Sequence, residues 1–101
     1  MKKELEINKL KNMLEVNNIP FEERACFGGT QLVLLDDNGK KLADAIQHRY
    51  SYGNEDNLIE IQGGLTEEEF DNDSVLGYLT AEEVFNRFLY CYEHSSSIYR
   101  N

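Results

Sequence analysis

The segment of residues 47–53 holds the densest group of side chains that could do chemistry. It places an imidazole (His48), a guanidinium (Arg49) and hydroxyl groups in one run that ends at Gly53. His48 is a candidate general base. No Ser, Cys or carboxylate stands at a spacing from His48 that forms a nucleophile–base–orienter set. The sequence therefore favours a protein that is not an enzyme. The simplest interpretation of the segment is a strand end whose tyrosines cover the edge of a sheet.

The same segment carries groups that suit a small-ligand site. Arginine and backbone amides bind phosphate, and tyrosine stacks on a base, so a nucleotide-like ligand is one expected partner. The two Gly-Gly pairs lack the spacing of phosphate-binding loops and are interpreted as turns. The residues of this candidate ligand site are Gly28, Gly29, Gln31, His48, Arg49, Ser51 and Tyr52.

No metal or other cofactor is expected. Cys26 and Cys91 have no further Cys or His at the spacing of a zinc site, so both are interpreted as free thiols. Asp71 and Asp73 resemble the start of a calcium-binding loop. Apolar residues follow them where an oxygen ligand and a glycine are required, which argues against calcium.

Acidic residues dominate the interval between Arg49 and Arg87, which contains ten acids and no lysine or arginine. Such a stretch attracts a basic surface and speeds association with it. One hypothesis is that it imitates the charge of nucleic acid and binds the basic surface of another protein. The alternative is a solvated flank, in which Glu82 and Glu83 cap a helix. The expected partner-binding acids are Glu55, Asp56, Glu67, Glu68, Glu69, Asp71 and Asp73.

Length and charge exclude several classes of protein. The 101 residues suit a single domain, residues 1–101, and 19 acids against 10 bases give a formal charge of −9. This charge argues against binding to nucleic acid directly or to an anionic membrane surface. No apolar run approaches the roughly 20 residues that span a bilayer, and the basic N-terminus lacks an apolar signal region. We therefore expect a cytoplasmic protein.

Hydrophobic periodicity predicts a helix near each end of the chain. Residues 4–17 form the first, and the closing helix begins at Thr80. Thr80 and Glu83 have the spacing of a capping box, which makes this start the best-marked boundary in the sequence. The apolar side of the first helix contains Ile7, Leu10 and Leu14, and that of the closing helix contains Val84, Phe85, Phe88, Leu89, Cys91 and Tyr92.

The segment between the helices predicts an antiparallel sheet. Gly28-Gly29 and Asn38-Gly39 suit two-residue turns, because both pairs tolerate positive φ. The order α-β-β-β-β-α indicates an α+β domain, a four-stranded antiparallel sheet with both helices packed on one face. Residues 65–79 show one capped helical turn at Thr66–Phe70 and no further clear element. The expected strands are residues 21–27, 30–36, 40–48 and 57–62.

Two-residue turns fix the register of both hairpins and so assign the faces of the sheet. One face is nearly all apolar and is assigned to the helices: Phe21, Ala25, Phe27, Leu32, Leu34, Ala43 and Ala45. The other face is mixed, with Arg24, Val33 and Asp44 in one row and Leu35 opposite Leu42. It is either a solvated sheet face or the interface of a homodimer. The expected dimer residues are Val33, Leu35, Leu42, Asp44 and Ile46.

Four motifs occur in a distinctive order along the chain. They are Gly-Gly-x-Gln within residues 26–32, Ser-Tyr-Gly within 44–53, Leu-x-Glu-Ile at 58–61 and Gly-Tyr-Leu-Thr-Ala-Glu-Glu-Val-Phe within 73–85. In these segments the chain resembles a family of small uncharacterised proteins encoded by tailed phages and prophages of Firmicutes. The resemblance implies an accessory phage protein that acts in the host cytoplasm, and it supplies no catalytic residue or cofactor. With the acidity, it favours binding or inhibition of a host protein over catalysis.

Overall fold

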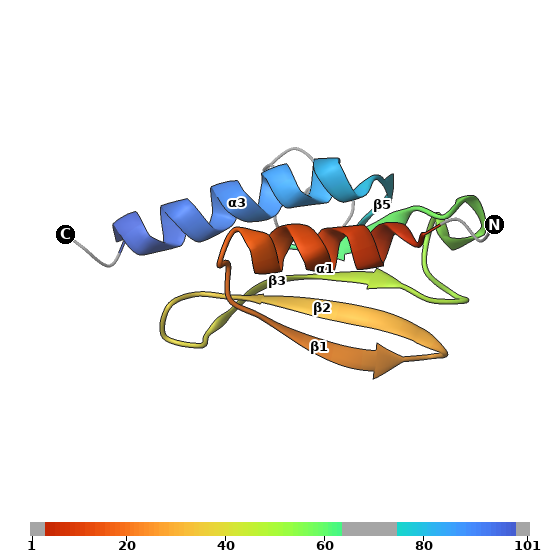
Figure 1. The fold of residues 1–101 in the computed structure, drawn as a ribbon, viewed down its shortest axis with the longest axis horizontal. Helices are drawn as coiled ribbons and strands as arrows, with labels where there is room; N and C mark the ends of the chain where they lie inside the picture. The colour runs from red at the N-terminus through yellow and green to blue at the C-terminus, as the bar shows by residue number, and fades with distance from the viewer. Residues whose placement is uncertain (1–3, 64–74, 99–101) are drawn as a thin grey trace.

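In the residues that the structure describes, two helices pack on one face of a five-stranded sheet (Figure 1). The computed structural model describes residues 4–63 and 75–98, with side chains as far as Ser95. In these ranges the elements are α1 (Glu6–Val16), β1 (Phe21–Cys26), β2 (Gly29–Leu35), β3 (Lys41–Gln47), the 3-10 turn η1 (Asn54–Asp56), β4 (Ile59–Gln62), β5 (Val75–Leu79) and α3 (Ala81–Ile98). Each strand pairs antiparallel with the next, in the order β1-β2-β3-β4-β5. The α+β prediction is confirmed, and the predicted number of strands is wrong.

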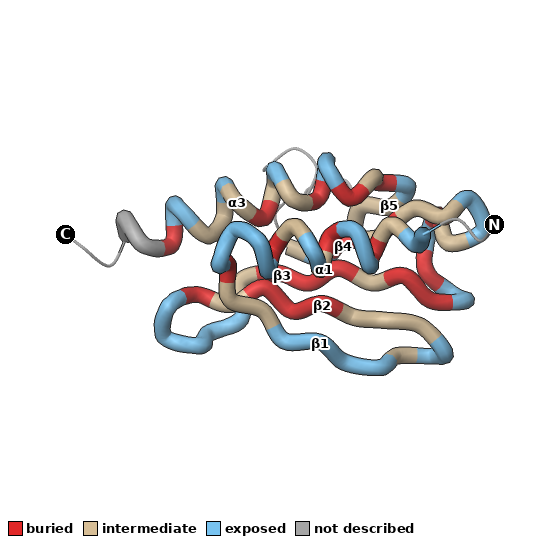
Figure 2. Tube along the Cα trace, viewed as in Figure 1, coloured by how far each residue is buried: buried red, intermediate tan, exposed pale blue. Residues whose placement is uncertain are grey.

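The core lies between the helices and the sheet (Figure 2). The predicted apolar side of α1 is buried throughout, and Val84 and Phe88 of α3 are fully buried beside it. Burial of one such side chain stabilises the fold by roughly 1.5–3 kcal/mol. Ala43 and Ala45 lie beneath the helices, where a small side chain permits close approach of helix and sheet. The sheet contributes Leu32, Leu34, Ala43, Ala45, Ile59 and Ile61 to this core.

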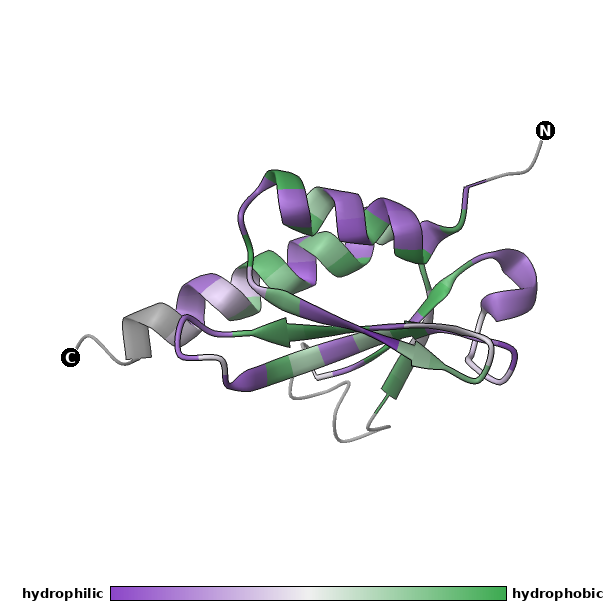
Figure 3. Cartoon of the chain, turned by 60° about the horizontal axis from the view of Figure 1, so that its bottom comes forward, coloured by the Kyte–Doolittle hydropathy of each residue, from purple (hydrophilic) through white to green (hydrophobic). Residues whose placement is uncertain are grey.

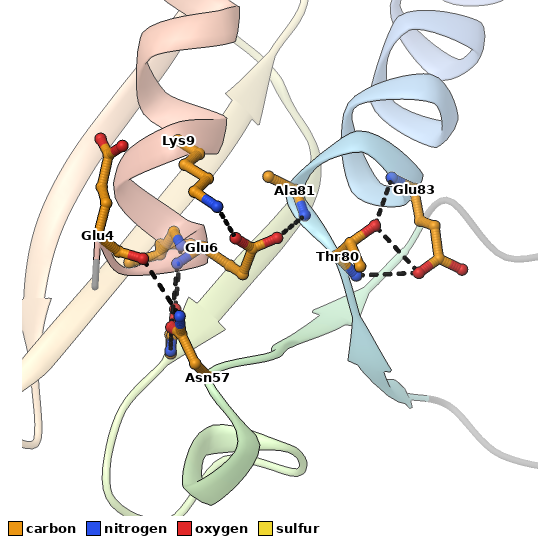
Figure 4. Close-up of polar contacts among 9 residues, drawn as sticks. Glu4, Glu6, Lys9, Asn57, Thr80, Ala81 and Glu83 are labelled. Carbon is orange, nitrogen blue, oxygen red and sulfur yellow. Dashed lines mark hydrogen bonds and ion pairs between the residues drawn. The ribbon is translucent and has the colours of Figure 1, made fainter.

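The N-terminus of α3 has the predicted capping box. The N–H of Glu83 donates to Oγ1 of Thr80 at 3.2 Å, and the N–H of Thr80 donates to the Glu83 carboxylate at 3.0 Å (Figure 4). Both bonds satisfy N–H groups that a helix start leaves without partners. Neither helix, over its described length, is apolar enough to cross a bilayer.

The fifth strand, β5, was not predicted from the sequence because its residues do not alternate between apolar and polar as strand residues usually do. β5 contains Gly77, and Tyr78 has a φ of 61°. Its pairing with β4 shifts register between Ile59 and Ile61. Leu79 nevertheless stands opposite Ile59, and both are buried in the core. This strand is therefore defined by its pairing with β4 and not by an alternating pattern of side chains.

The first hairpin turns at Phe27 and Gly28, one residue earlier than predicted. Their φ values are 45° and 76°, as a two-residue turn of the I′ kind requires. Gly29 is instead the first residue of β2 and pairs with Cys26. A Cβ on Gly29 would lie 2.1 Å from the carbonyl oxygen of Gln47. Gly29, the second glycine of the pair, therefore allows the backbone at the end of β3 to approach β2 closely.

This earlier turn moves the β1–β2 register by two residues and leaves the faces unchanged. Glu22, not Arg24, stands opposite Val33 in the row that leads to Asp44. The predicted row of Arg24, Val33 and Asp44 is therefore wrong at Arg24, which stands opposite Gln31. Arg24 pairs with Glu22 at 3.0 Å, and Asp44 pairs with Lys41 at 2.8 Å.

The second hairpin is closed by a loop organised around Asp36, and not by a two-residue Asn38-Gly39 turn. The Asp36 carboxylate accepts hydrogen bonds from two backbone N–H groups of the loop, at 2.9 and 2.8 Å. The register shifts at this end, so Leu35 stands opposite Lys41 and not opposite Leu42. Farther from the loop the predicted pairs are confirmed: Val33 with Asp44, and Gln31 with Ile46.

Candidate functional site

The end of the sheet that holds the β1–β2 turn also holds the loop between β3 and β4 (Figure 1). Four large aromatic side chains are exposed on these segments and on the adjacent β5: Phe27 at 62%, Tyr50 at 69%, Tyr52 at 57% and Tyr78 at 53%. We call these four residues, together with Arg49, the aromatic end surface. Single exposed aromatics need no explanation, whereas a group at one end of a small domain marks a candidate contact surface.

Phe27 is held in a left-handed backbone conformation with its side chain in solvent. Its ring makes edge contacts with His48, at 5.2 Å between centroids, and with Tyr50, at 5.5 Å. In the described part of the chain, the other non-glycine residues with positive φ are Asn18, Asn57 and Tyr78. Asparagine adopts this conformation readily, but a bulky side chain costs about 1–2 kcal/mol there. Two aromatic residues of this surface are therefore placed at the expense of stability.

The prediction that Phe27 faces the helices is wrong. Phe27 lies in the turn and not in a strand, and the adjacent Ala25 is exposed as well. The helices cover the middle of the sheet and leave this end of β1 uncovered (Figure 2). The apolar side chain of Phe27 is therefore available to another molecule.

Arg49 lies against the same turn. Its Nε donates to the carbonyl oxygen of Phe27 at 3.3 Å, and its guanidinium carbon lies 5.6 Å from the centre of the Tyr50 ring. A Cβ added to Gly28 would lie 3.5 Å from one of its terminal nitrogens. No carboxylate of the described residues pairs with Arg49. The guanidinium is thus oriented by the turn, and no acid of residues 4–63 and 75–95 forms an ion pair with it.

His48 organises the loop and does not present a free base. Its Nδ1 accepts a hydrogen bond from the N–H of Tyr50 at 3.0 Å. Its own N–H donates to Oγ of Ser51 at 2.9 Å, and that hydroxyl donates to the His48 carbonyl at 2.8 Å. The residue as a whole is 8% exposed. In the neutral imidazole the proton therefore sits on Nε2, and the lone pair that a general base needs is already engaged.

Tyr52 and Tyr78 form the second part of the surface. The N–H of Tyr78 donates to the carbonyl oxygen of Tyr52 at 3.3 Å, and the N–H of Tyr52 donates to the Glu60 carboxylate at 2.8 Å. A Cβ on Gly77 would lie 2.4 Å from Cβ of Tyr52. Gly77 is therefore the residue that allows this loop to pack on β5.

The structure brings together only part of the candidate ligand site. Gly28, Gly29, His48 and Arg49 lie around the turn, and Ser51 fixes the same loop. Gln31 is in β2, opposite Ile46, and its amide donates to the Asp44 carboxylate at 3.1 Å. The candidate ligand site as a whole stays a prediction.

Of the seven acids predicted to bind a partner, the structure describes only Glu55 and Asp56. Glu55 and Asp56 belong to η1 and are exposed. The η1 turn lies at the same end of the molecule as the β1–β2 turn (Figure 3). Gly53 and Asn57, on either side of η1, have φ values of 99° and 58° and give it its tight shape. The remaining predicted acids, Glu67, Glu68, Glu69, Asp71 and Asp73, lie outside the described residues.

The predicted dimer face shows little free apolar surface. Val33 and Asp44 are buried, and Leu35, Leu42 and Ile46 are half-buried. Leu42 also packs against the core between helices and sheet. A homodimer through this face stays a prediction.

Sequence reasoning singled out His48, Arg49 and Tyr52 and missed the exposure of Phe27 and Tyr78. Positive φ at a bulky residue leaves no mark in the sequence. The two tyrosines at positions 50 and 52 are the feature of the sequence that indicated aromatic residues at this end of the sheet. Both cysteines are free thiols, and burial raises the pKa of the Cys91 thiol. Residues 4–63 and 75–98 contain no group of three or more metal-ligating side chains.

No protein-family model matches this chain, and neither curated proteins nor solved structures include a significant match.

Proposed function

We propose that this chain is a non-enzymatic binding protein that docks its aromatic end surface on a protein partner. The observation that supports this proposal is Phe27, an exposed aromatic residue in a left-handed turn conformation. Strained backbone that persists at an exposed position points to function, because stability alone does not retain it. The sequence resemblance to phage-encoded proteins makes a bacterial host protein the expected partner.

The composition of the surface suits a protein interface. Tyrosine, phenylalanine and arginine are enriched at the centres of interfaces, where a few such residues provide most of the binding free energy. A buried aromatic side chain removes on the order of 150–250 Å² from water. Phe27, Arg49 and Tyr50 contact one another and can therefore be buried together.

The surface is also organised before any partner arrives. The N–H of Tyr50 donates to the His48 imidazole, the N–H of Tyr52 donates to the Glu60 carboxylate, and Nε of Arg49 donates to the Phe27 carbonyl. Side chains and loops that are already ordered lose less conformational entropy on binding. This arrangement favours docking of a preformed surface over folding of a loop on its partner.

Exposed acids at the same end add an electrostatic component. Glu55 and Asp56 lie on η1, and the whole chain has a formal charge of −9. A partner with basic residues near this site would associate faster at low ionic strength. This part of the proposal retains the acidic-surface hypothesis for the two acids that the structure places.

Phe27→Asn separates binding from stability, because Asn-Gly is a preferred pair for this turn. We expect the substitution to raise the free energy of unfolding by about 1 kcal/mol, since it relieves the left-handed phenylalanine. Affinity capture from a lysate of a Firmicutes host should retain a protein on the wild type and lose it on Phe27→Asn. Tyr90→Asn is the matched control, because Tyr90 is also 62% exposed but lies on α3.

The outcomes of this comparison are distinct. Retention of the same protein by wild type and Tyr90→Asn, with loss on a stably folded Phe27→Asn, supports the proposal. Equal retention by all three proteins overturns it. Tyr50→Ser leaves the Phe27–Gly28 turn unchanged and should also abolish retention of the host protein. This result would show that the loss on Phe27→Asn is not caused by a change in the turn backbone.

A further inference from the structure

We infer that Arg49 is the anchor for a carboxylate of the partner, and that the segment bound at the aromatic end surface carries one acidic residue beside an apolar one. This inference rests on the proposed function, because it assigns a chemistry to the same surface. It is carried by a guanidinium that the turn orients and that no acid among the described residues neutralises.

The orientation of Arg49 comes from two contacts. Nε donates to the Phe27 carbonyl at 3.3 Å, and the guanidinium lies 5.6 Å from the centre of the Tyr50 ring. These contacts engage the inner edge and one face of the group. Its terminal N–H groups have no hydrogen-bond partner among the described residues. They form the planar fork that binds a carboxylate through two parallel hydrogen bonds.

The surroundings of Arg49 make its unpaired charge unusual. Glu55 and Asp56 are exposed on the loop that follows it, and neither forms an ion pair with Arg49. No other lysine or arginine occurs until Arg87. A segment with several acids would be repelled by this acidic end, whereas a single carboxylate beside an apolar side chain satisfies Arg49 and covers Phe27 and Tyr50.

His48 provides a second donor at the same turn. Since Nδ1 accepts from the N–H of Tyr50, the neutral ring carries its proton on Nε2. The Phe27 ring contacts His48, and the Phe27 carbonyl accepts from Arg49, so both donors adjoin the same turn residue.

A random peptide library presented to the full chain tests this chemistry without a known partner. Peptides are selected on the wild type and then depleted on Phe27→Asn, so that only sequences bound at the aromatic end surface remain. We expect these sequences to share one Asp or Glu next to an aromatic or aliphatic residue. Selection on Arg49→Glu should replace that acid by Lys or Arg.

A double-mutant cycle on the best peptide then measures the contact. Arg49→Gln should weaken binding about tenfold or more, as expected for a charged pair of hydrogen bonds. Replacement of the peptide carboxylate by its amide should cause the same loss, and the two changes together should add little. Arg49→Lys should restore part of the affinity, because lysine keeps the charge but not the fork. Arg24→Gln is the control, since Arg24 is already paired with Glu22.

Failures of the two proposals can be told apart. Peptides that bind wild type and Phe27→Asn equally, or no enriched peptide, overturn both the proposed function and the anchor. Phe27-dependent peptides that lack an acid, or that are insensitive to Arg49→Gln, overturn the anchor alone. Binding of inorganic phosphate to wild type but not to Arg49→Gln, without such peptides, assigns Arg49 to phosphate and overturns the carboxylate inference.

Discussion

The carboxylate of Glu6, in the first turn of α1, accepts a hydrogen bond from the N–H of Ala81, the first residue of α3, at 2.9 Å (Figure 4). The same carboxylate pairs with Lys9 at 2.8 Å, and its side chain is 13% exposed. A negative charge at the positive end of α3 is favourable, and the bond satisfies an N–H that the helix itself leaves free. One side chain therefore fixes how the two helices start.

Glu6→Ala should lower the free energy of unfolding by about 1–3 kcal/mol, because it leaves the Ala81 N–H without its acceptor. Glu6→Gln should cost less, since its amide oxygen can still accept the bond. Urea denaturation measures both changes. Glu4→Ala is the control, because the hydrogen bond that Glu4 forms in this region uses its backbone carbonyl, which the substitution keeps. A Glu6→Ala protein as stable as the wild type would contradict the assigned role.

Asn57 joins α1 to the loop that carries the aromatic residues. Its side-chain oxygen accepts from the N–H of Glu6 at 3.1 Å and from the Gln47 amide at 2.8 Å, while its φ is 58°. Asn57→Ala removes the acceptor and forces alanine into a left-handed conformation, so we expect a loss of about 2–3 kcal/mol. Asn57→Gly keeps the conformation and should lose about 1 kcal/mol less. Equal losses in thermal unfolding would show that the backbone conformation contributes nothing.

Gly29→Ala should be among the most damaging single-methyl changes in the chain. The added Cβ would lie 2.1 Å from the Gln47 carbonyl oxygen and 2.7 Å from Cα of His48, both backbone atoms. We expect β3 to move and the loss to exceed about 2 kcal/mol, in the range of strained overpacking. Gly39→Ala meets no atom within 4 Å but has a φ of 83°, so it should cost about 1 kcal/mol. Circular dichroism on heating would rank the two; the reverse order would refute the close approach.

The Tyr92 hydroxyl donates to the carboxylate of Asp37 and links α3 to the β2–β3 loop. This bond raises the pKa of Tyr92 above its ordinary value of 10.0. A pKa raised by folding means that the contribution to stability is complete below the unfolded pKa and is lost as the pH rises through the folded pKa. The difference in unfolding free energy between wild type and Tyr92→Phe should therefore be constant up to about pH 9 and shrink at higher pH. A difference that grows with alkaline pH would contradict this contact.

Local signals predicted the parts of the fold that depend on local interactions. The capping box of Thr80 and Glu83 and the apolar sides of α1 and α3 are confirmed, because a helix start and a helical stripe are set by nearby residues. The choice between Gly28 and Gly29 for the first turn depends on the approach of β3, which is a tertiary contact. β5 was missed because Gly77, Tyr78 and a register shift remove its alternation.

The candidate site was predicted at Arg49 and His48 but not at Phe27. Their side-chain chemistry is visible in the sequence, whereas the exposure of an apolar residue depends on where the helices end. The sequence pattern places Phe27 at the end of a strand covered by the helices. In the structure the strand ends at Cys26, and Phe27 is instead the first residue of the turn.

Because Phe27 has a left-handed conformation, evolution at this position faces two opposed demands. Selection for stability favours a residue that adopts positive φ easily, whereas selection for binding favours an aromatic side chain. A lineage in which only folding matters would drift toward Asn-Gly at positions 27 and 28, because that pair gives the more stable turn. A lineage in which the contact matters would keep an aromatic residue there despite the cost. The identity of residue 27 in a related chain therefore reports whether that chain still uses this surface.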